Sequence, residues 1–164
     1  MAIPDANAAE RSATRGHAAI LWALTLLFFL RVLGQALVAF LHVTFLPPMK
    51  EWMSGLLPYP GLLASQILIL IFQAKVNGDL SFGRGYFFEP RPRLGRFLRG
   101  ASLVYAAGMA IRYGVTMTLF PDRRWLGTGT IPIVFHFVLA GWLFTLAHAL
   151  SRTRGTRGAS LDRA

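Results

Sequence analysis

Residues 18–46 read AAILWALTLLFFLRVLGQALVAFLHVTFL, an apolar run whose strongly polar residues are Arg31, Gln35 and His42. A helix needs about 20 mostly apolar residues to cross the hydrocarbon core of a bilayer. The run exceeds that length, and the prolines at 47–48 are expected to end it because proline cannot donate the helical hydrogen bond. It therefore predicts a transmembrane helix that is long enough to tilt or to project beyond the core.

Three further apolar runs occupy residues 60–75, 97–119 and 131–150, the first of them being short. Hydrophobic residues make up 54% of the chain and charged residues 15%, whereas a soluble domain carries about 25% charged residues. The sequence thus predicts an all-α integral membrane protein: one domain, residues 18–150, folded as a four-transmembrane-helix bundle.

Basic residues are distributed unevenly among the segments that flank these runs. Residues 1–17 hold two, the stretch 75–99 holds six and the tail 151–164 holds four, whereas the segments on the other side hold three. Loops rich in Lys and Arg stay in the cytoplasm, so the pattern predicts a cytoplasmic N-terminal segment and a disordered, basic cytoplasmic tail. We expect the basic loop to contact anionic lipids, and the Ala-, Leu- and Arg-rich composition favours a bacterial inner membrane.

Residues 48–57 carry apolar side chains at helical spacing, on one face of a short segment. They are Met49, Trp52, Met53, Leu56 and Leu57. This pattern predicts a short amphipathic helix that lies in the outer membrane interface without crossing it. We expect the ring of Trp52 at the level of the lipid headgroups.

Several polar side chains lie inside the predicted spans, where they are costly and mark functional sites by default. The candidates are Arg31, Gln35, His42, Gln66, Gln73, Tyr105, Arg112 and His136. Counted at about 1.5 Å per residue, one group from each of the four helices falls roughly 6 to 10 Å below the outer surface. On each helix that carries several, they are four or seven residues apart and share one face. We predict a polar shaft that opens toward the outer side.

The predicted spans contain no Asp or Glu, so Arg31 and Arg112 have no carboxylate partner within them. A guanidinium stays protonated, so its charge must meet amides, carbonyls, water or an anionic ligand. This predicts a non-enzymatic membrane protein whose shaft binds an anionic amphiphile or which serves as a subunit of a membrane complex. The third interpretation, ranked after the haem alternative described next, is a purely structural accessory subunit, in which the same side chains only hydrogen-bond the helices together.

The second interpretation, the haem alternative, is an electron-transfer protein with a b-type haem between His42 and His136, which share a similar predicted depth. His17 and His148, at the inner ends of the first and last spans, offer a second pair. The chain has no Cys and no clustered carboxylates, and the sequence predicts neither catalytic residues nor a metal site. Nucleic-acid binding is not expected, because the basic loop already serves membrane topology.

Overall fold

The computed structural model describes residues 6–52, 58–119 and 130–151. Within these ranges the chain is helical, with connecting turns and no strand, which confirms the all-α prediction. The helices are α1 (Ala6–Leu41), α2 (Met49–Trp52), α3 (Tyr59–Phe82), α4 (Pro92–Leu119) and α5 (Thr130–Leu150).

Three stretches are long and apolar enough to cross a membrane, namely Thr14–Leu41 in α1, Tyr59–Phe82 in α3 and Ile131–Leu150 in α5. By the length and composition of its helices, the chain is a multi-pass helical membrane protein. Helix α4 has 28 residues, but it carries four arginines and is not among these three. The fourth span stays a prediction.

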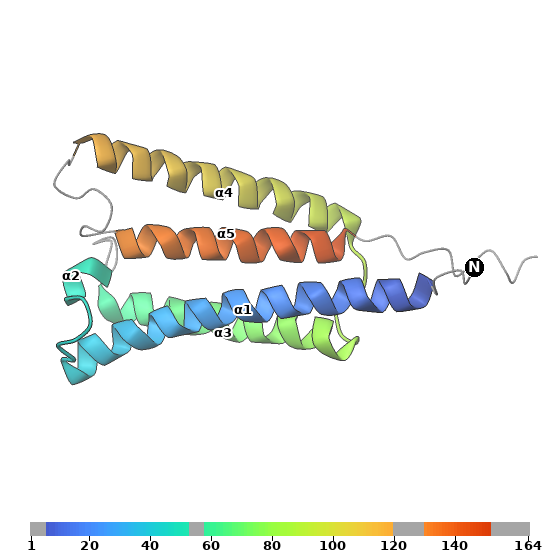
Figure 1. Cartoon of the computed structure of the whole chain (residues 1–164), viewed down its shortest axis with the longest axis horizontal. Helices are drawn as coiled ribbons and strands as arrows, with labels where there is room; N and C mark the ends of the chain where they lie inside the picture. Colours follow the sequence, from blue (N-terminus) through green and yellow to red (C-terminus); the bar gives the residue numbers. More distant parts are fainter. Residues whose placement is uncertain (1–5, 53–57, 120–129, 152–164) are drawn as a thin grey trace, which may run out of the picture.

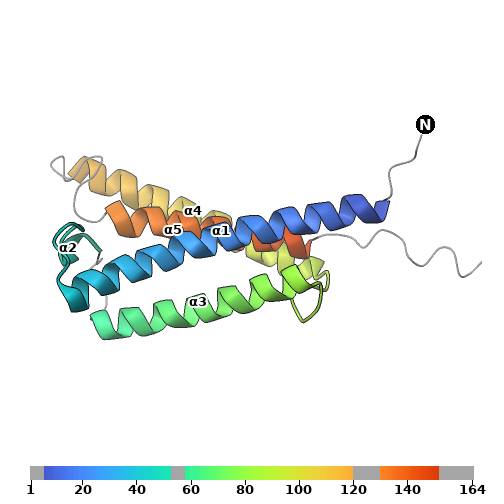
Figure 2. The ribbon, with the colours of Figure 1, turned by 60° about the horizontal axis from the view of Figure 1, so that its bottom comes forward.

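The four long helices form an open row in the order α4, α5, α1, α3 (Figures 1 and 2). Helix α1 packs against both α5 and α3, whereas α4 packs against α5 alone. Among the described residues, no Cα of α3 lies within 8 Å of one in α4 or α5. The arrangement therefore differs from the closed bundle expected of four antiparallel helices, because α3 and α4, at the two ends of the row, each have close backbone contacts with only one other helix among the described residues.

The two ends of the row differ. At one end, here called the α2 end, α2 packs against α1 and α5. At the other, the loop end, α1 begins, α5 finishes and residues 83–91 connect α3 to α4 (Figure 1). The segments that the sequence analysis predicts to be cytoplasmic adjoin the loop end.

Two helix ends differ from the sequence-based expectation. Helix α1 finishes at Leu41 and not at residue 46, because His42 adopts a left-handed backbone conformation with φ of 51°. Helix α3 continues through the polar residues after Lys75 and stops at Gly83, whose φ of 65° and N–H bond to the Asp79 carbonyl form a left-handed cap.

Asp79 thus lies within a helix, in a chain whose predicted spans hold no carboxylate. It is buried and organises the loop end: it pairs with Lys75, and its Oδ2 accepts a hydrogen bond from the backbone N–H of Phe87 at 3.3 Å. Gly85 lies against it with φ of 103°, and a Cβ there would sit 2.5 Å from the carboxylate carbon. The loop between α3 and α4 is therefore built around one buried charge.

The apolar core lies toward the loop end. Its buried members come from the start of α1, the end of α3 and the end of α5: Ala18, Leu21, Val76, Leu80, Trp142, Leu146, Ala149 and Leu150. Gly95 lets α4 approach α5 closely, since a Cβ there would lie 2.8 Å from the carbonyl oxygen of Ala147. Close packing of this kind holds helices together in lipid, where exclusion from water contributes little.

The segment predicted as an interfacial helix is described only as far as Trp52. Residues 49–52 form α2, whereas residues 53–57 lie outside the described ranges, as do residues 1–5 and the tail beyond 151. Trp52 itself is 7% exposed. Its ring packs on Gly34, where a Cβ would lie 2.8 Å from Cη2, and its Nε1 donates to the carbonyl oxygen of Pro47 at 2.8 Å. The ring therefore packs in a notch of α1 at Gly34, and its level relative to the headgroups stays a prediction.

Candidate ligand-binding site

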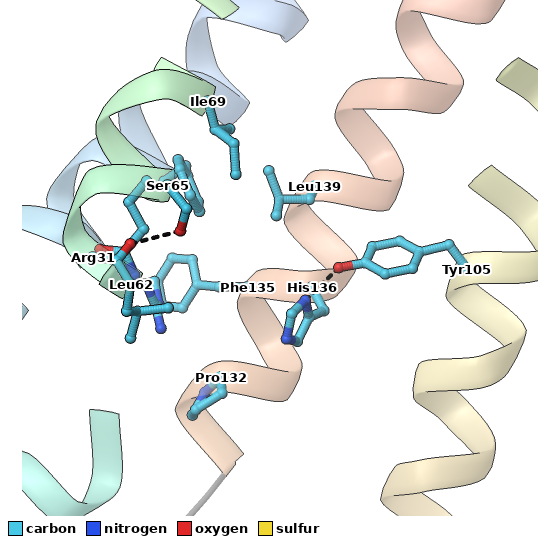
Figure 3. A pocket seen from close by; sticks show the side chains of 11 residues that line it. Arg31, Leu62, Ser65, Ile69, Tyr105, Pro132, Phe135, His136 and Leu139 are labelled. Atoms are coloured by element: carbon cyan, nitrogen blue, oxygen red, sulfur yellow. Dashed lines mark hydrogen bonds between the residues drawn. The ribbon is translucent and has the colours of Figure 1, made fainter. Parts of the chain in front are cut away.

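A cavity of about 250 Å³ lies near the α2 end, between α3 and α5 (Figure 3). Helix α1 contributes Phe28 and Arg31 to it, and α4 contributes Tyr105. The remaining lining residues are Leu62, Ser65, Gln66 and Ile69 of α3, and Pro132, Phe135, His136 and Leu139 of α5. Most of the wall is thus apolar, with a few polar groups that converge on the interior, as is typical of small-molecule sites.

The cavity exists because the backbones of α3 and α5 are too far apart for close contact. One turn beyond the lining residues Ile69 and Leu139, toward the loop end, the rings of Phe72 and Trp142 meet with centroids 5.9 Å apart. Trp142 belongs to the apolar core. The core therefore adjoins the cavity at its loop-end side.

Arg31 is the buried charge of this site, with 7% of its surface exposed. Its Nη1 donates to Gln35 Oε1 at 3.4 Å, and its Nη2 donates to the carbonyl oxygen of Trp52 at 3.2 Å. Its Cζ lies 5.7 Å from the ring centroid of Phe135, a cation–π contact. The buried Nε has no hydrogen-bond partner in the part of the chain that the structure describes. Part of the guanidinium thus remains unsatisfied in the protein alone.

A pair of buried glutamines extends the network from α1 to α3. Gln66 Nε2 donates to Gln35 Oε1 at 3.1 Å, so this oxygen accepts from both Arg31 and Gln66. Gln35 Nε2 and Gln66 Oε1 are buried and have no hydrogen-bond partner within the described ranges. Buried polar groups nearly always have hydrogen-bond partners in folded proteins, so these two atoms indicate where a water molecule or a ligand would bind.

Tyr105 and His136 form the opposite side of the polar site. The tyrosine hydroxyl and His136 Nδ1 share a short hydrogen bond between α4 and α5, with the two rings nearly perpendicular at 86° (Figure 3). Arg31 is the charged side chain among the residues that line the cavity. A positive charge in a largely apolar cavity attracts anions.

The structure brings together five of the eight candidates from the sequence: Arg31, Gln35 and Gln66 in one network, and Tyr105 with His136 beside it. The other three lie elsewhere. His42 is exposed in the turn after α1, and Arg112 is half-buried and does not line the cavity. Gln73 is 1% exposed, with no partner for either amide atom, and it also lies outside the cavity lining.

These positions bear on the haem alternative. His42 does not line the cavity with His136, whose Nδ1 is already engaged by Tyr105. The other histidine pair does come together, since the rings of His17 and His148 lie 6.4 Å apart at 26° near the loop end. Within the described ranges, no three side chains of the His, Cys, Asp and Glu types form a metal-binding group.

Sequence reasoning missed three contributors to this site. Phe135 supplies the aromatic face under Arg31, Trp52 supplies its backbone carbonyl, and Gly34 seats the Trp52 ring. A signal for the last was available: Gly34 follows Arg31 by three residues, so the two share a helix face. The sequence gives no such signal for the Trp52 carbonyl, which accepts from Arg31 at the end of a short helix.

Comparisons with protein-family models, with curated proteins and with solved structures find no match to this chain. What the protein does is therefore inferred from the chemistry of its site.

Proposed function

We propose that this protein binds an anionic amphiphile in the cavity between α3 and α5, with the negative headgroup at Arg31. The observation that carries the proposal is a buried guanidinium without a carboxylate partner. The two ion pairs among the described residues are Lys75–Asp79 and Arg91–Glu89, and neither lies at the cavity.

The charge itself demands compensation. An arginine near the middle of a span costs roughly 2.5 to 3.5 kcal/mol on insertion scales, and it cannot escape by losing its proton. Gln35 and the Trp52 carbonyl provide two hydrogen bonds but no negative charge. A bound anion would supply both the charge and a partner for Nε.

The walls of the cavity favour an amphiphile over a small soluble anion. Phe28, Leu62, Ile69, Phe135 and Leu139 would surround an acyl chain with apolar surface. Because α3 has no backbone contact with α5, the chain would also fill the gap between these helices. The apolar core stabilises the loop end, and the ligand would extend that packing toward the α2 end.

The proposal includes four spans, with both termini in the cytoplasm. At about 1.5 Å per residue, 28 residues of α4 extend far enough to cross a bilayer beside α5. Arginines gather at the loop end, where Arg84, Arg93, Arg96 and Arg99 are exposed. This suits a cytoplasmic face in contact with anionic lipids. In that orientation the cavity would lie toward the outer side of the membrane.

Native mass spectrometry of the purified full-length protein tests the proposal. The wild type is expected to retain a co-purifying anionic lipid that Arg31→Gln loses, while the Arg15→Gln variant, which also removes one positive charge at an exposed position, retains it. Equal lipid retention in all three folded proteins would contradict an anion site at Arg31 and favour the structural alternative, in which Arg31 only joins helices. An absorbance spectrum of the same wild-type sample tests the haem alternative through its Soret band.

A further inference from the structure

We infer that the headgroup bound at Arg31 carries a hydroxyl group close to its negative charge, as in a glycerophosphate lipid. The inference rests on the proposed function and narrows it to one class of ligand. It comes from the direction of the hydrogen bonds in the network of Arg31, Gln35 and Gln66.

Arg31 fixes that direction because a guanidinium can only donate hydrogen bonds. The Gln35 atom that faces Arg31 Nη1 must therefore be the amide oxygen. The same oxygen faces Gln66, so Gln66 must present its NH₂ group to it. Although the two ends of a glutamine amide look alike, the charge of Arg31 determines both orientations here.

The network leaves unlike groups without partners. Arg31 Nε is a donor and Gln66 Oε1 is an acceptor; both are buried, without a partner among the described residues, and both belong to residues that line the cavity. Gln35 Nε2 is a further unpaired donor, but Gln35 is not part of the lining. A simple phosphodiester or carboxylate offers only acceptors at neutral pH, so it satisfies Arg31 Nε and leaves Gln66 Oε1 unpaired. A ligand that satisfies both atoms needs a negative oxygen and a hydrogen-bond donor within the same headgroup.

Two features of the site select the donor and the kind of molecule. An ammonium donor is disfavoured by the buried positive charge of Arg31, which lines the cavity, so a neutral hydroxyl fits best. The apolar residues that line most of the wall favour a lipid over the free phosphate ester. Phosphatidylglycerol combines a single negative charge, two hydroxyls and acyl chains, and it serves as the probe.

The experiment compares lipids that differ only in the hydroxyls. Delipidated full-length protein is titrated in detergent with dioleoyl phosphatidylglycerol or dioleoyl phosphatidylpropanol, whose headgroup keeps the three carbons without the hydroxyls, and bound lipid is counted by native mass spectrometry. Both lipids carry one phosphodiester charge and the same chains. We expect phosphatidylglycerol to bind about tenfold more tightly, which corresponds to about 1.4 kcal/mol. Chain-free glycerol phosphate, added as competitor in excess, is expected not to displace it; displacement would identify the soluble ester as the ligand and overturn the lipid assignment.

Gln66→Leu removes the acceptor and should abolish this preference while both lipids still bind. Asn77→Leu is the matched control: Asn77 is also a buried amide of α3 that bonds to α1, through Thr25 at 2.9 Å, but it does not line the cavity. This control should keep the tenfold preference. A preference that persists in folded Gln66→Leu would overturn the inference.

The wild type alone is decisive even if Gln66→Leu does not fold. Equal affinity for the two lipids would overturn the hydroxyl inference and leave the anion site standing. No binding of either lipid above that of phosphatidylcholine would overturn the proposed function as well, so the two failures are distinguishable.

Discussion

Arg31 donates a hydrogen bond from Nη2 to the backbone carbonyl of Trp52 at 3.2 Å, which ties a charge inside α1 to the last residue of α2. The Trp52 ring in turn occupies the notch at Gly34, one helical turn from Arg31. Helix α2 thus holds the guanidinium that the proposed ligand would contact. A substitution at Gly34 should therefore shift the position of the Arg31 guanidinium.

Gly34→Ala tests this coupling. The new Cβ would lie 2.8 Å from Trp52 Cη2, and overpacking of this kind costs about 1 to 3 kcal/mol. We expect a lower melting temperature in detergent together with weaker retention of the anionic lipid. Gly108→Ala is the control, because a Cβ at Gly108 meets nothing within 4 Å. If Gly34→Ala melts like the control and retains the lipid, the notch does not position Arg31.

Gly85→Ala should loosen the opposite end of the molecule. Its φ of 103° disfavours any side chain, and the Cβ would collide with the Asp79 carboxylate. A residue held in such a backbone region costs about 1 to 3 kcal/mol, so we expect faster proteolysis of the α3–α4 loop. Gly100→Ala, at an open position of α4, should leave the cleavage rate unchanged. Equal rates in both variants would argue against a loop built around Asp79.

The hydrogen bond between Tyr105 and His136 joins α4 to α5 at the cavity. Tyr105→Phe and His136→Leu should each lower stability, and the double variant should cost less than the sum because the shared bond is removed only once. A coupling of about 1 kcal/mol is expected for one hydrogen bond. Additive losses in the unfolding free energies would show that the two side chains act independently.

Cysteine accessibility tests the topology, since the chain has no cysteine of its own. Thr118 lies exposed near the α2 end of α4, and Glu89 lies exposed in the loop before this helix. A membrane-impermeant thiol reagent applied to intact cells should label Thr118→Cys but not Glu89→Cys, and lysed cells should label both. Labelling of neither or of both in intact cells would contradict a fourth span in α4, and the reverse pattern would invert the orientation.

Much of the fold could be predicted because each long helix contains an apolar run, and three of them have a proline in the first turn. The helix ends could not be predicted as well, since they depend on single backbone conformations at His42 and Gly83. The order in which the four long helices lie side by side could not be predicted from the sequence either. It depends on side-chain fit, such as the close approach of α4 to α5 at Gly95, for which hydrophobic periodicity gives no signal.

The candidate site could be predicted in part. Arg31 and Gln35 are four residues apart on one helix, so their contact follows from helical geometry. The placement of His42 failed because the depth count assumed that α1 continues through it. Gln73 is buried but does not line the cavity. Its burial could be predicted from the sequence, whereas the presence of a cavity beside it depends on the distance between α3 and the neighbouring helix.

Site-specific photo-crosslinking in cells tests the central claim most directly, because it reports both what is bound and where. Benzoylphenylalanine replaces Leu139, which lines the cavity, or Val104, which is 74% exposed on α4. After illumination, mass spectrometry identifies the lipid attached at each position. We expect an anionic lipid to be enriched at position 139 relative to position 104, and the enrichment to disappear in Arg31→Gln. The same mixture of lipids at both positions, with and without Arg31, would contradict an anionic amphiphile site in this cavity.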